Sequence, residues 1–134
     1  MPALRTYSVF VCHDWEYSED YYRICDFLDQ ARNFDWENLS VPEHDPLDSR
    51  DRLEYHLRNQ IRPADVMLVL AGMYSARSGW MDWELQFARR IGTPIIAIRP
   101  WGSERLPQVV QDNATEIVGW NTGTIVDAIR RWGR

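Results

Sequence analysis

The run V-M-L-V-L-A, residues 66–71, decides the fold class of this chain. All six residues are apolar, which is typical of a parallel strand that is covered on both faces. The run P-I-I-A-I, residues 94–98, has the same character. Between them lies S-G-W-M-D-W-E-L-Q-F-A-R-R-I-G, residues 78–92, whose apolar spacing predicts a helix that ends at Gly92 and Pro94. A strand, a helix and a strand in this order indicate a parallel α/β sheet.

The rest of the chain continues this alternation on both sides. We expect further strands over residues 7–12, 39–41 and 116–120. We expect further helices after Ser18, before Pro63 and over residues 125–132, and a loop rich in Pro and polar residues before the last strand. The sequence therefore predicts one domain, residues 1–134, with a flavodoxin-like doubly wound sheet. This sheet has about five mostly parallel strands, right-handed crossovers and helices on both faces.

Composition excludes several classes of function. The net charge is −5, which argues against nucleic acid as a partner. All 15 basic residues are Arg, so the chemistry of a Schiff-base lysine or a phosphate-loop lysine is excluded. No secretory signal is visible at the N-terminus, and no apolar run approaches the roughly 20 residues that span a bilayer. We expect a cytoplasmic protein without a membrane partner, in which Cys12 and Cys25 are free thiols.

Ligands of such folds bind at the carboxyl ends of the strands, so the segments that follow the strands bear on function. The turn after the first strand, H-D-W-E-Y, residues 13–17, lacks the glycines of a dinucleotide-binding loop and the Ser, Thr or Gly of a flavodoxin phosphate loop. A phospho-receiver domain would need a lysine. The histidines and cysteines show no paired metal-ligand spacing, so no metal is expected, and His56 is expected at the surface. Cys12 is expected to be a small core residue.

One acid interrupts the apolar side of the 78–92 helix. Its apolar stripe consists of Trp80, Trp83, Phe87, Ala88 and Ile91. Glu84 lies in the middle of this stripe. The helix dipole stabilises an acid only in the first turn, and Glu84 lies beyond it, so Asp82 suits the dipole role better. Two interpretations of Glu84 stay open. It pairs with an arginine under the rim of the sheet, or it lines a pocket where a carboxylate stabilises a developing cation. The tryptophans are likewise either core residues or the wall of a pocket.

The segment Y-S-A-R-S-G-W-M-D-W-E-L, residues 74–85, resembles the Ser-x-Trp-x-x-x-Glu region of TIR (Toll/interleukin-1 receptor) domains. The run Y-S-V-F-V-C-H-D, residues 7–14, looks like the strand and turn that open these domains. The run P-E-H-D-P-L-D-S-R-D, residues 42–51, stands where their loop after the second strand belongs. The resemblance covers essentially the whole chain in element order and length. A stand-alone domain of this kind is similar to the TIR-like proteins of bacterial Thoeris anti-phage systems, which convert NAD into a nucleotide signal.

The resemblance implies an enzyme that cleaves the nicotinamide-ribose bond of NAD, with NAD as substrate and no further cofactor. It implies Glu84 as the catalytic residue. The residues that it implies for substrate binding are Cys12, His13, Asp14, Asp45, Ser78 and Trp80. The product is ADP-ribose if water attacks, and a cyclic or conjugated signal if another nucleophile attacks.

The resemblance also implies partners, and it leaves two other functions open. The implied partners are further copies of the domain through TIR-TIR contacts, a separate effector reached through the nucleotide product, and a phage-derived trigger. One alternative is a TIR-like adaptor that only assembles with other TIR domains, in which the Pro- and Asp-rich loop at 42–48 would matter. A third option is an enzyme similar to the nucleoside 2-deoxyribosyltransferases, which also use a carboxylate at the ribose.

Overall fold

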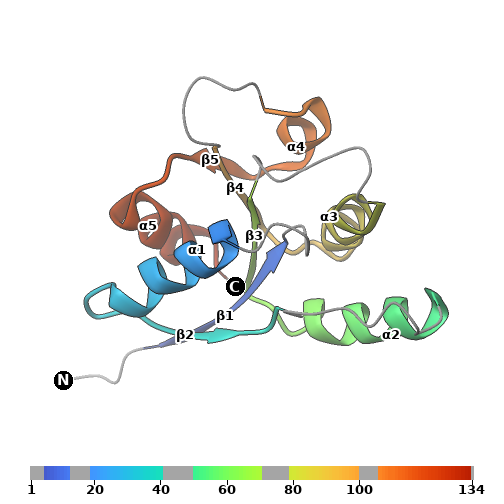
Figure 1. Ribbon diagram of the computed structural model, residues 1–134, viewed down its shortest axis with the longest axis horizontal. Coiled ribbons are helices and arrows are strands. Elements are labelled where there is room, and N and C mark those ends of the chain that lie inside the picture. The colour runs from blue at the N-terminus through green and yellow to red at the C-terminus, as the bar shows by residue number, and fades with distance from the viewer. Residues whose placement is uncertain (1–4, 13–18, 41–49, 71–78, 100–105, 134) are drawn as a thin grey trace.

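The computed structural model describes residues 5–12, 19–40, 50–70, 79–99 and 106–133, except for the side chains of residues 50, 51, 53, 79 and 80 (Figure 1). The strands are β1 (Thr6–Cys12), β2 (Asp35–Asn38), β3 (Val66–Leu70), β4 (Ile95–Ile98) and β5 (Glu116–Val118). The helices are α1 (Glu19–Gln30), α2 (Arg50–Ile61), α3 (Gly79–Ile91), α4 (Gln108–Asn113) and α5 (Thr122–Trp132).

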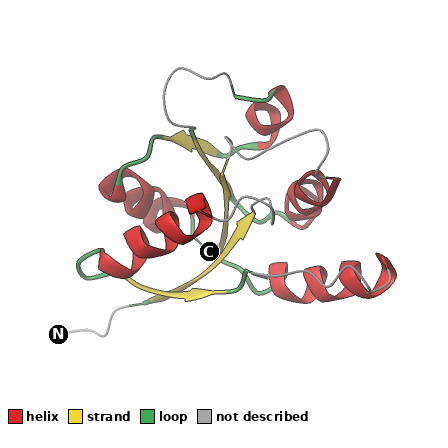
Figure 2. Ribbon diagram, viewed as in Figure 1, coloured by secondary structure: helices red, strands yellow, loops and turns green. Residues whose placement is uncertain are grey.

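The strands form one parallel sheet in the order β2-β1-β3-β4-β5. Figure 2 shows α1 and α5 on one face of this sheet and α2, α3 and α4 on the other. The sheet is therefore doubly wound, and the predicted flavodoxin-like α/β class is confirmed. The change in strand order falls between β1 and β3, so the carboxyl ends of these two strands mark the usual ligand position of the fold.

The core is built on the central strands. Every side chain of β3 and of β4 is at most 1% exposed, because helices cover both faces of the sheet. This burial explains why both strands are continuously apolar instead of alternating between apolar and polar residues. In β1 the last four residues, Val9 to Cys12, are buried as well, and their side chains alternate between the two faces. Cys12 thus belongs to the core, as expected.

The predicted position of the second strand, residues 39–41, is wrong. The strand β2 lies earlier and pairs with β1 from Thr6↔Asp35 to Val9↔Asn38, and the amide of Leu39 adds one more bond to the Val9 carbonyl, at 2.9 Å. β2 is an edge strand and its side chains are mostly exposed, so its sequence D-W-E-N carries no apolar run. Hydrogen-bond pairing with β1 determines where this strand lies. A search for apolar residues selects the later residues 39–41 instead.

Two features near the C-terminal end of the chain also differ from expectation. The expected loop before the last strand contains the short helix α4, which begins after Pro107 and buries Val110. Six residues are too few for a clear helical period in the sequence. The last strand ends at Val118 and does not reach Trp120, whose ring packs edge-on against Phe27 at 5.9 Å between centroids.

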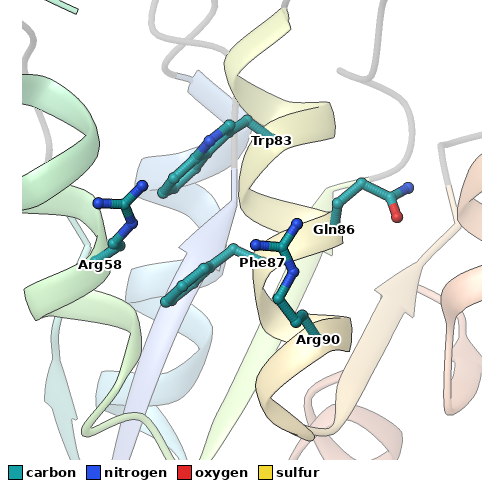
Figure 3. Close-up of a pocket in the computed structure, with 5 residues that line it drawn as sticks. All are labelled: Arg58, Trp83, Gln86, Phe87 and Arg90. Atoms are coloured by element: carbon teal, nitrogen blue, oxygen red, sulfur yellow. The ribbon is translucent and has the colours of Figure 1, made fainter. Parts of the chain in front are cut away.

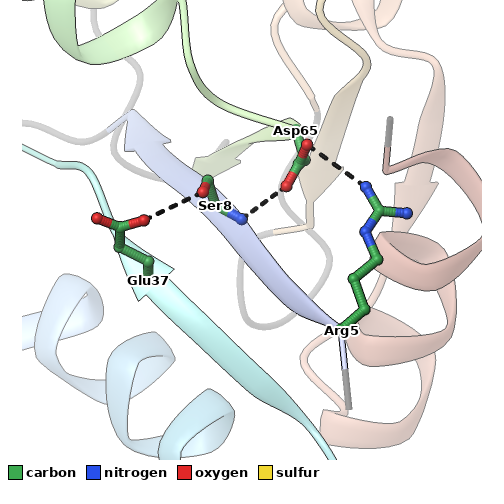
Figure 4. Close-up of polar contacts among 4 residues, drawn as sticks. All are labelled: Arg5, Ser8, Glu37 and Asp65. Carbon is green, nitrogen blue, oxygen red and sulfur yellow. Dashed lines mark hydrogen bonds and ion pairs between the residues drawn. The ribbon is translucent and has the colours of Figure 1, made fainter. Parts of the chain in front are cut away.

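Polar contacts hold the strands together at the amino end of the sheet (Figure 4). The carboxylate of Asp65, the residue before β3, accepts a hydrogen bond from the Ser8 amide at 2.9 Å and lies 3.4 Å from the Arg5 guanidinium. The Ser8 hydroxyl donates to the Glu37 carboxylate of β2 at 3.2 Å. These contacts link β1 to both of its neighbours. Arg5, Asp65 and Glu37 thus take part in contacts between strands, whereas folds of this class bind ligands at the opposite, carboxyl end of the sheet. None of the described helices is long and apolar enough to cross a membrane.

Candidate functional site

The helix α3 confirms that Glu84 lies on the buried side, but it corrects the apolar stripe. The residues that face the sheet are Met81, Glu84, Leu85 and Ala88, which follow the i, i+3, i+4, i+7 spacing of a core-facing helix. Glu84 is 2% exposed and the other three are fully buried. The predicted stripe omitted Met81 and Leu85 and was therefore centred too far toward the tryptophans. Gly92 follows the helix with φ 80°, which confirms the predicted stop.

The aromatic residues Trp83 and Phe87 lie on the flank of α3 that faces α2 (Figure 3). Their rings stack at 5.4 Å with 5° between the planes, and the Arg58 guanidinium lies 5.8 Å from the centroid of the Trp83 ring. With Gln86 and Arg90 they line a hollow of about 60 Å³. Ligand pockets for drug-sized molecules measure about 300–1,000 Å³, so this hollow is too small for a nucleotide. Trp83 therefore contributes to the contact between α2 and α3.

Glu84 meets the carboxyl end of β1. The Cys12 thiol, which is fully buried, donates to the Met81 carbonyl with 3.7 Å between Sγ and O, and it also interacts with the nearby Glu84 carboxyl, whose pKa it lowers. Side chains of a helix lean toward its N-terminus, so the Glu84 carboxyl lies over the turn that carries the Met81 carbonyl. One thiol can therefore reach both groups. Cys12 and Glu84 are the two candidate site residues that the described structure brings together.

Burial governs the charge of this pair. Loss of water around the carboxyl raises the pKa of Glu84 from 4.5 to about 8, and the hydrogen bond from Cys12 lowers it in part. The pKa of the Cys12 thiol is raised well above its usual value, first by burial and then by the neighbouring Glu84 carboxyl and Asp82. Both groups are therefore mainly protonated in the free protein at neutral pH. A carboxyl of this kind changes its charge when a cation arrives beside it.

The described ion pairs lie elsewhere. They join Arg5 to Asp65, Arg58 to Glu54 and Arg131 to Glu116. Within the described ranges no arginine forms an ion pair with Glu84, so the interpretation as a buried structural pair finds no support there. Removing an ionised carboxyl from water without a countercharge beside it is unfavourable for folding. A carboxyl kept in this position despite that cost is a candidate functional group.

The other predicted site residues stay predictions. His13, Asp14, Asp45 and Ser78 lie outside the described residues. Trp80 is the second residue of α3, and its side chain is not among those described. In sequence, the segments 13–18, 41–49, 71–78 and 100–105 follow the carboxyl ends of β1, β2, β3 and β4. These four strands end on the side of the sheet that Glu84 approaches.

The contact between Cys12 and Glu84 was not foreseen, although each residue was singled out. Two signals could have pointed to it. Cys12 is the last residue of a buried strand and shares a face with Phe10, and Met81 precedes Glu84 by one turn. The expected character of Cys25 and His56 is confirmed: Cys25 is a free thiol and His56 is exposed. In the described part of the chain, no three His, Cys, Asp or Glu residues are grouped so that they could hold a metal ion.

A five-stranded parallel sheet in this order, with an acid of α3 buried against the end of β1, defines a class of α/β protein consistent with a TIR-like domain. The family comparison identifies the family: residues 10–105 match the TIR-like domain of Thoeris protein ThsB, and the chain belongs to this family. The matched range contains both Cys12 and Glu84. A comparison with curated proteins finds no match.

Solved structures of similar fold include two enzymes. A 2-deoxyribosyltransferase from Bacillus psychrosaccharolyticus is 14% identical, with a TM-score of 0.64 and 90% of each chain covered. The CMP N-glycosidase BcmB from Clostridium botulinum is also 14% identical, with a TM-score of 0.53, and the match covers 93% of this chain and 98% of that one. At this identity the likeness concerns the fold.

Proposed function

We propose that this member of the Thoeris TIR-like family is an NAD-consuming enzyme that cleaves the bond between nicotinamide and ribose. The observation that carries the proposal is the Glu84 carboxyl, which is 2% exposed, interacts with the Cys12 thiol and lies near the carboxyl end of β1. This is the end of the sheet where α/β folds bind ligands. The TIR resemblance of the Ser78 to Glu84 segment assigns the catalytic role to the same residue.

The chemistry suits a single carboxylate. Cleavage of an N-glycosidic bond passes through a state in which positive charge develops on the ribose. The nicotinamide ring of NAD is already cationic, so it takes the bonding electron pair and leaves as a neutral molecule without needing a proton. An ionised Glu84 stabilises the ribosyl cation, and its low-dielectric surroundings strengthen that interaction. When water attacks the ribose, the proton that water loses passes to the carboxylate and the product is ADP-ribose.

The raised pKa of Glu84 gives this chemistry a proton linkage. The free carboxyl titrates at about 8, whereas a cation within about 4–6 Å favours the ionised form. Binding of NAD with its cationic ring near Glu84 therefore releases a proton at neutral pH. A neutral nucleoside provides no such charge, so the site selects a cationic leaving group over a neutral base.

The remaining predicted residues complete the proposed pocket. Ser78 and Trp80 precede Glu84 on the same segment, while His13, Asp14 and Asp45 come from the segments after β1 and β2. We propose that the product is a cyclic or conjugated ADP-ribose that reaches a separate effector during anti-phage defence. Self-association through TIR-TIR contacts and a phage-derived trigger belong to the same proposal.

The test compares the wild type with Glu84→Gln, which keeps the size of the side chain and removes its charge. Glu37→Gln is the control, because it removes an exposed carboxylate of the edge strand β2. Nicotinamide release from NAD is measured with each purified protein and in lysates of phage-challenged cells that produce it. We expect at least a hundredfold loss in Glu84→Gln, the order of magnitude of one lost transition-state contact, and full activity in Glu37→Gln. Equal rates for Glu84→Gln and wild type would exclude Glu84 as the essential acid.

A second candidate is cleavage of the N-glycosidic bond of another nucleoside or nucleotide. It is favoured by the two solved structures of similar fold, which are titled a 2-deoxyribosyltransferase and a CMP N-glycosidase. The same variants are therefore assayed with NAD, deoxynucleosides and CMP in parallel. Activity on deoxynucleosides or CMP without activity on NAD selects this candidate. If Glu84→Gln matches wild type throughout and changes at residues 42–48 abolish self-association, the adaptor alternative is selected.

A further inference from the structure

The buried contact between β1 and α3 has a consequence for how the Glu84 carboxyl is held. Glu84 has no ion pair within the described residues, and the buried group that interacts with its carboxyl there is the Cys12 thiol. The same thiol reaches the Met81 carbonyl at 3.7 Å. Cys12 is fully buried, and as the last residue of β1 it is held by pairing with Val69 of β3. The thiol therefore has a fixed position, while the Glu84 side chain has three rotatable bonds.

We propose that Cys12 is a positioning residue for Glu84: its thiol, held between the Met81 carbonyl and the Glu84 carboxyl, orients that carboxyl toward the carboxyl end of the sheet and supports its ionised form. A thiol is a weak donor, so it stabilises the carboxylate without holding it permanently ionised. This suits a group that gains its charge when substrate arrives. The catalytic consequence rests on the proposed function, whereas the contact itself does not.

The neighbouring charges do not provide an alternative support within the described residues. β3 and β4 are wholly apolar and contribute no titratable side chain. From α2, Arg58 lies over the Trp83 ring and pairs with Glu54. From α4, Asp112 accepts a hydrogen bond from Gln108. On α3 itself, Asp82 is an acid and disfavours a second negative charge nearby.

The first experiment follows the titration of Glu84 without any substrate, from the ¹³C chemical shift of its carboxyl carbon. Cys12→Ala removes the donor, and Cys12→Ser keeps a donor of similar size. Val11→Ala is the matched control, because it makes a cavity in the same strand on the face opposite to α3. We expect the midpoint to rise by about one pH unit in Cys12→Ala, the equivalent of one hydrogen bond to a charged group. Cys12→Ser should titrate at or below the wild-type midpoint, and Val11→Ala should match wild type. Equal midpoints in Cys12→Ala and wild type would overturn the proposal.

A second measurement avoids altering Cys12, in case Cys12→Ala does not fold. In a Cys25→Ser background Cys12 is the single thiol of the chain, so its S–H stretching band can be followed by infrared spectroscopy. We expect this band to shift as Glu84 ionises and to be independent of pH over the same range after Glu84→Gln. A band that does not respond to Glu84 would overturn the proposal.

The third measurement separates this inference from the proposed function. The pH profile of nicotinamide release is recorded for the wild type and the three variants. We expect the midpoint of the profile to shift with the Glu84 midpoint in each variant, and Cys12→Ser to restore the wild-type profile. A titration shift in Cys12→Ala without nicotinamide release by any protein supports the positioning role and contradicts the NAD-cleaving function. Nicotinamide release with the same pH profile in Cys12→Ala and wild type overturns the positioning role and leaves the function intact.

Discussion

Replacing Glu84 with Gln is expected to stabilise the folded protein, and increasingly so as the pH rises. The folded carboxyl has its pKa raised from 4.5 to about 8, mainly by burial. Below the unfolded value both states carry the proton, and Glu84 has no electrostatic effect on stability. As pH rises above it, the unfolded chain releases its proton while the folded chain retains it, so stability falls until the folded group also ionises. Gln does not titrate and lacks this dependence.

The magnitude follows from the two pKa values. The gap between 4.5 and about 8 corresponds to a maximum cost of roughly 5 kcal/mol, reached above the folded value. At about pH 7 the cost is roughly 3 kcal/mol, and between about pH 6 and about pH 8 it grows by roughly 2 kcal/mol. The side chain is 2% exposed, so solvent screening reduces these figures little. Typical domains are stable by only about 5–15 kcal/mol, so the effect is large.

The assay is urea unfolding of wild type and Glu84→Gln at several values between about pH 6 and about pH 8, below the range in which Cys12 ionises. Groups that are common to both proteins contribute equally to each of them, so their effect cancels in the difference. We expect this difference to widen by roughly 2 kcal/mol across the window, with equal m-values. Glu37→Gln should follow wild type, because its side chain is exposed and the Gln oxygen can still accept the hydrogen bond from the Ser8 hydroxyl. A difference that stays constant with pH would refute the raised pKa of the buried Glu84 carboxyl.

Two further predictions concern the ends of helices. Gly92→Ala should destabilise the folded protein by about 1–2 kcal/mol, because φ is 80° there and no atom lies within 4 Å that a methyl group could contact. In Gly119→Ala the added methyl group also enters open space, but Gly119 has no positive φ. A larger loss of stability in Gly119→Ala than in Gly92→Ala, measured by thermal unfolding, would contradict this account. Asn121→Ala should destabilise by about 1 kcal/mol, because the Asn121 side chain caps α5 by accepting from the Thr124 amide at 3.2 Å. Asn121→Ser should retain most of that stability, and equal denaturation midpoints for Asn121→Ala and wild type would show that the cap contributes nothing.

The accuracy of the sequence-based predictions depends on whether an element is buried. Residues 66–71 and 94–98 predicted β3 and β4 because strands covered on both faces must be apolar throughout. The edge strand β2 was misplaced by several residues because its exposed side chains carry no such pattern. The helix α4 was missed because one buried valine in six residues gives no period. Exposed and short elements depend on pairing and packing that a local pattern does not contain.

The sequence predicted one part of the candidate site and not the other. The apolar stripe of the 78–92 segment indicated that Glu84 lies on the buried side of its helix, since helical periodicity is a local property. The sequence did not determine which face of the helix is buried, because Met81, Leu85 and the tryptophans are all apolar. Only packing against the sheet decides which of them face the core. Trp83 shows the consequence: it lies beside Arg58 on the flank toward α2.

The sequence by itself determined the alternation of strands and helices, the parallel sheet and the position of an acid on a buried helix face. Each of these follows from the spacing of apolar residues and from the residues that end helices, which act over a few positions of the chain. Only the tertiary structure decided that the Glu84 carboxyl meets the Cys12 thiol and that its pKa rises to about 8. Desolvation and hydrogen bonding depend on which distant segments pack together. They arise here because α3 folds back over the end of β1, far away in the sequence.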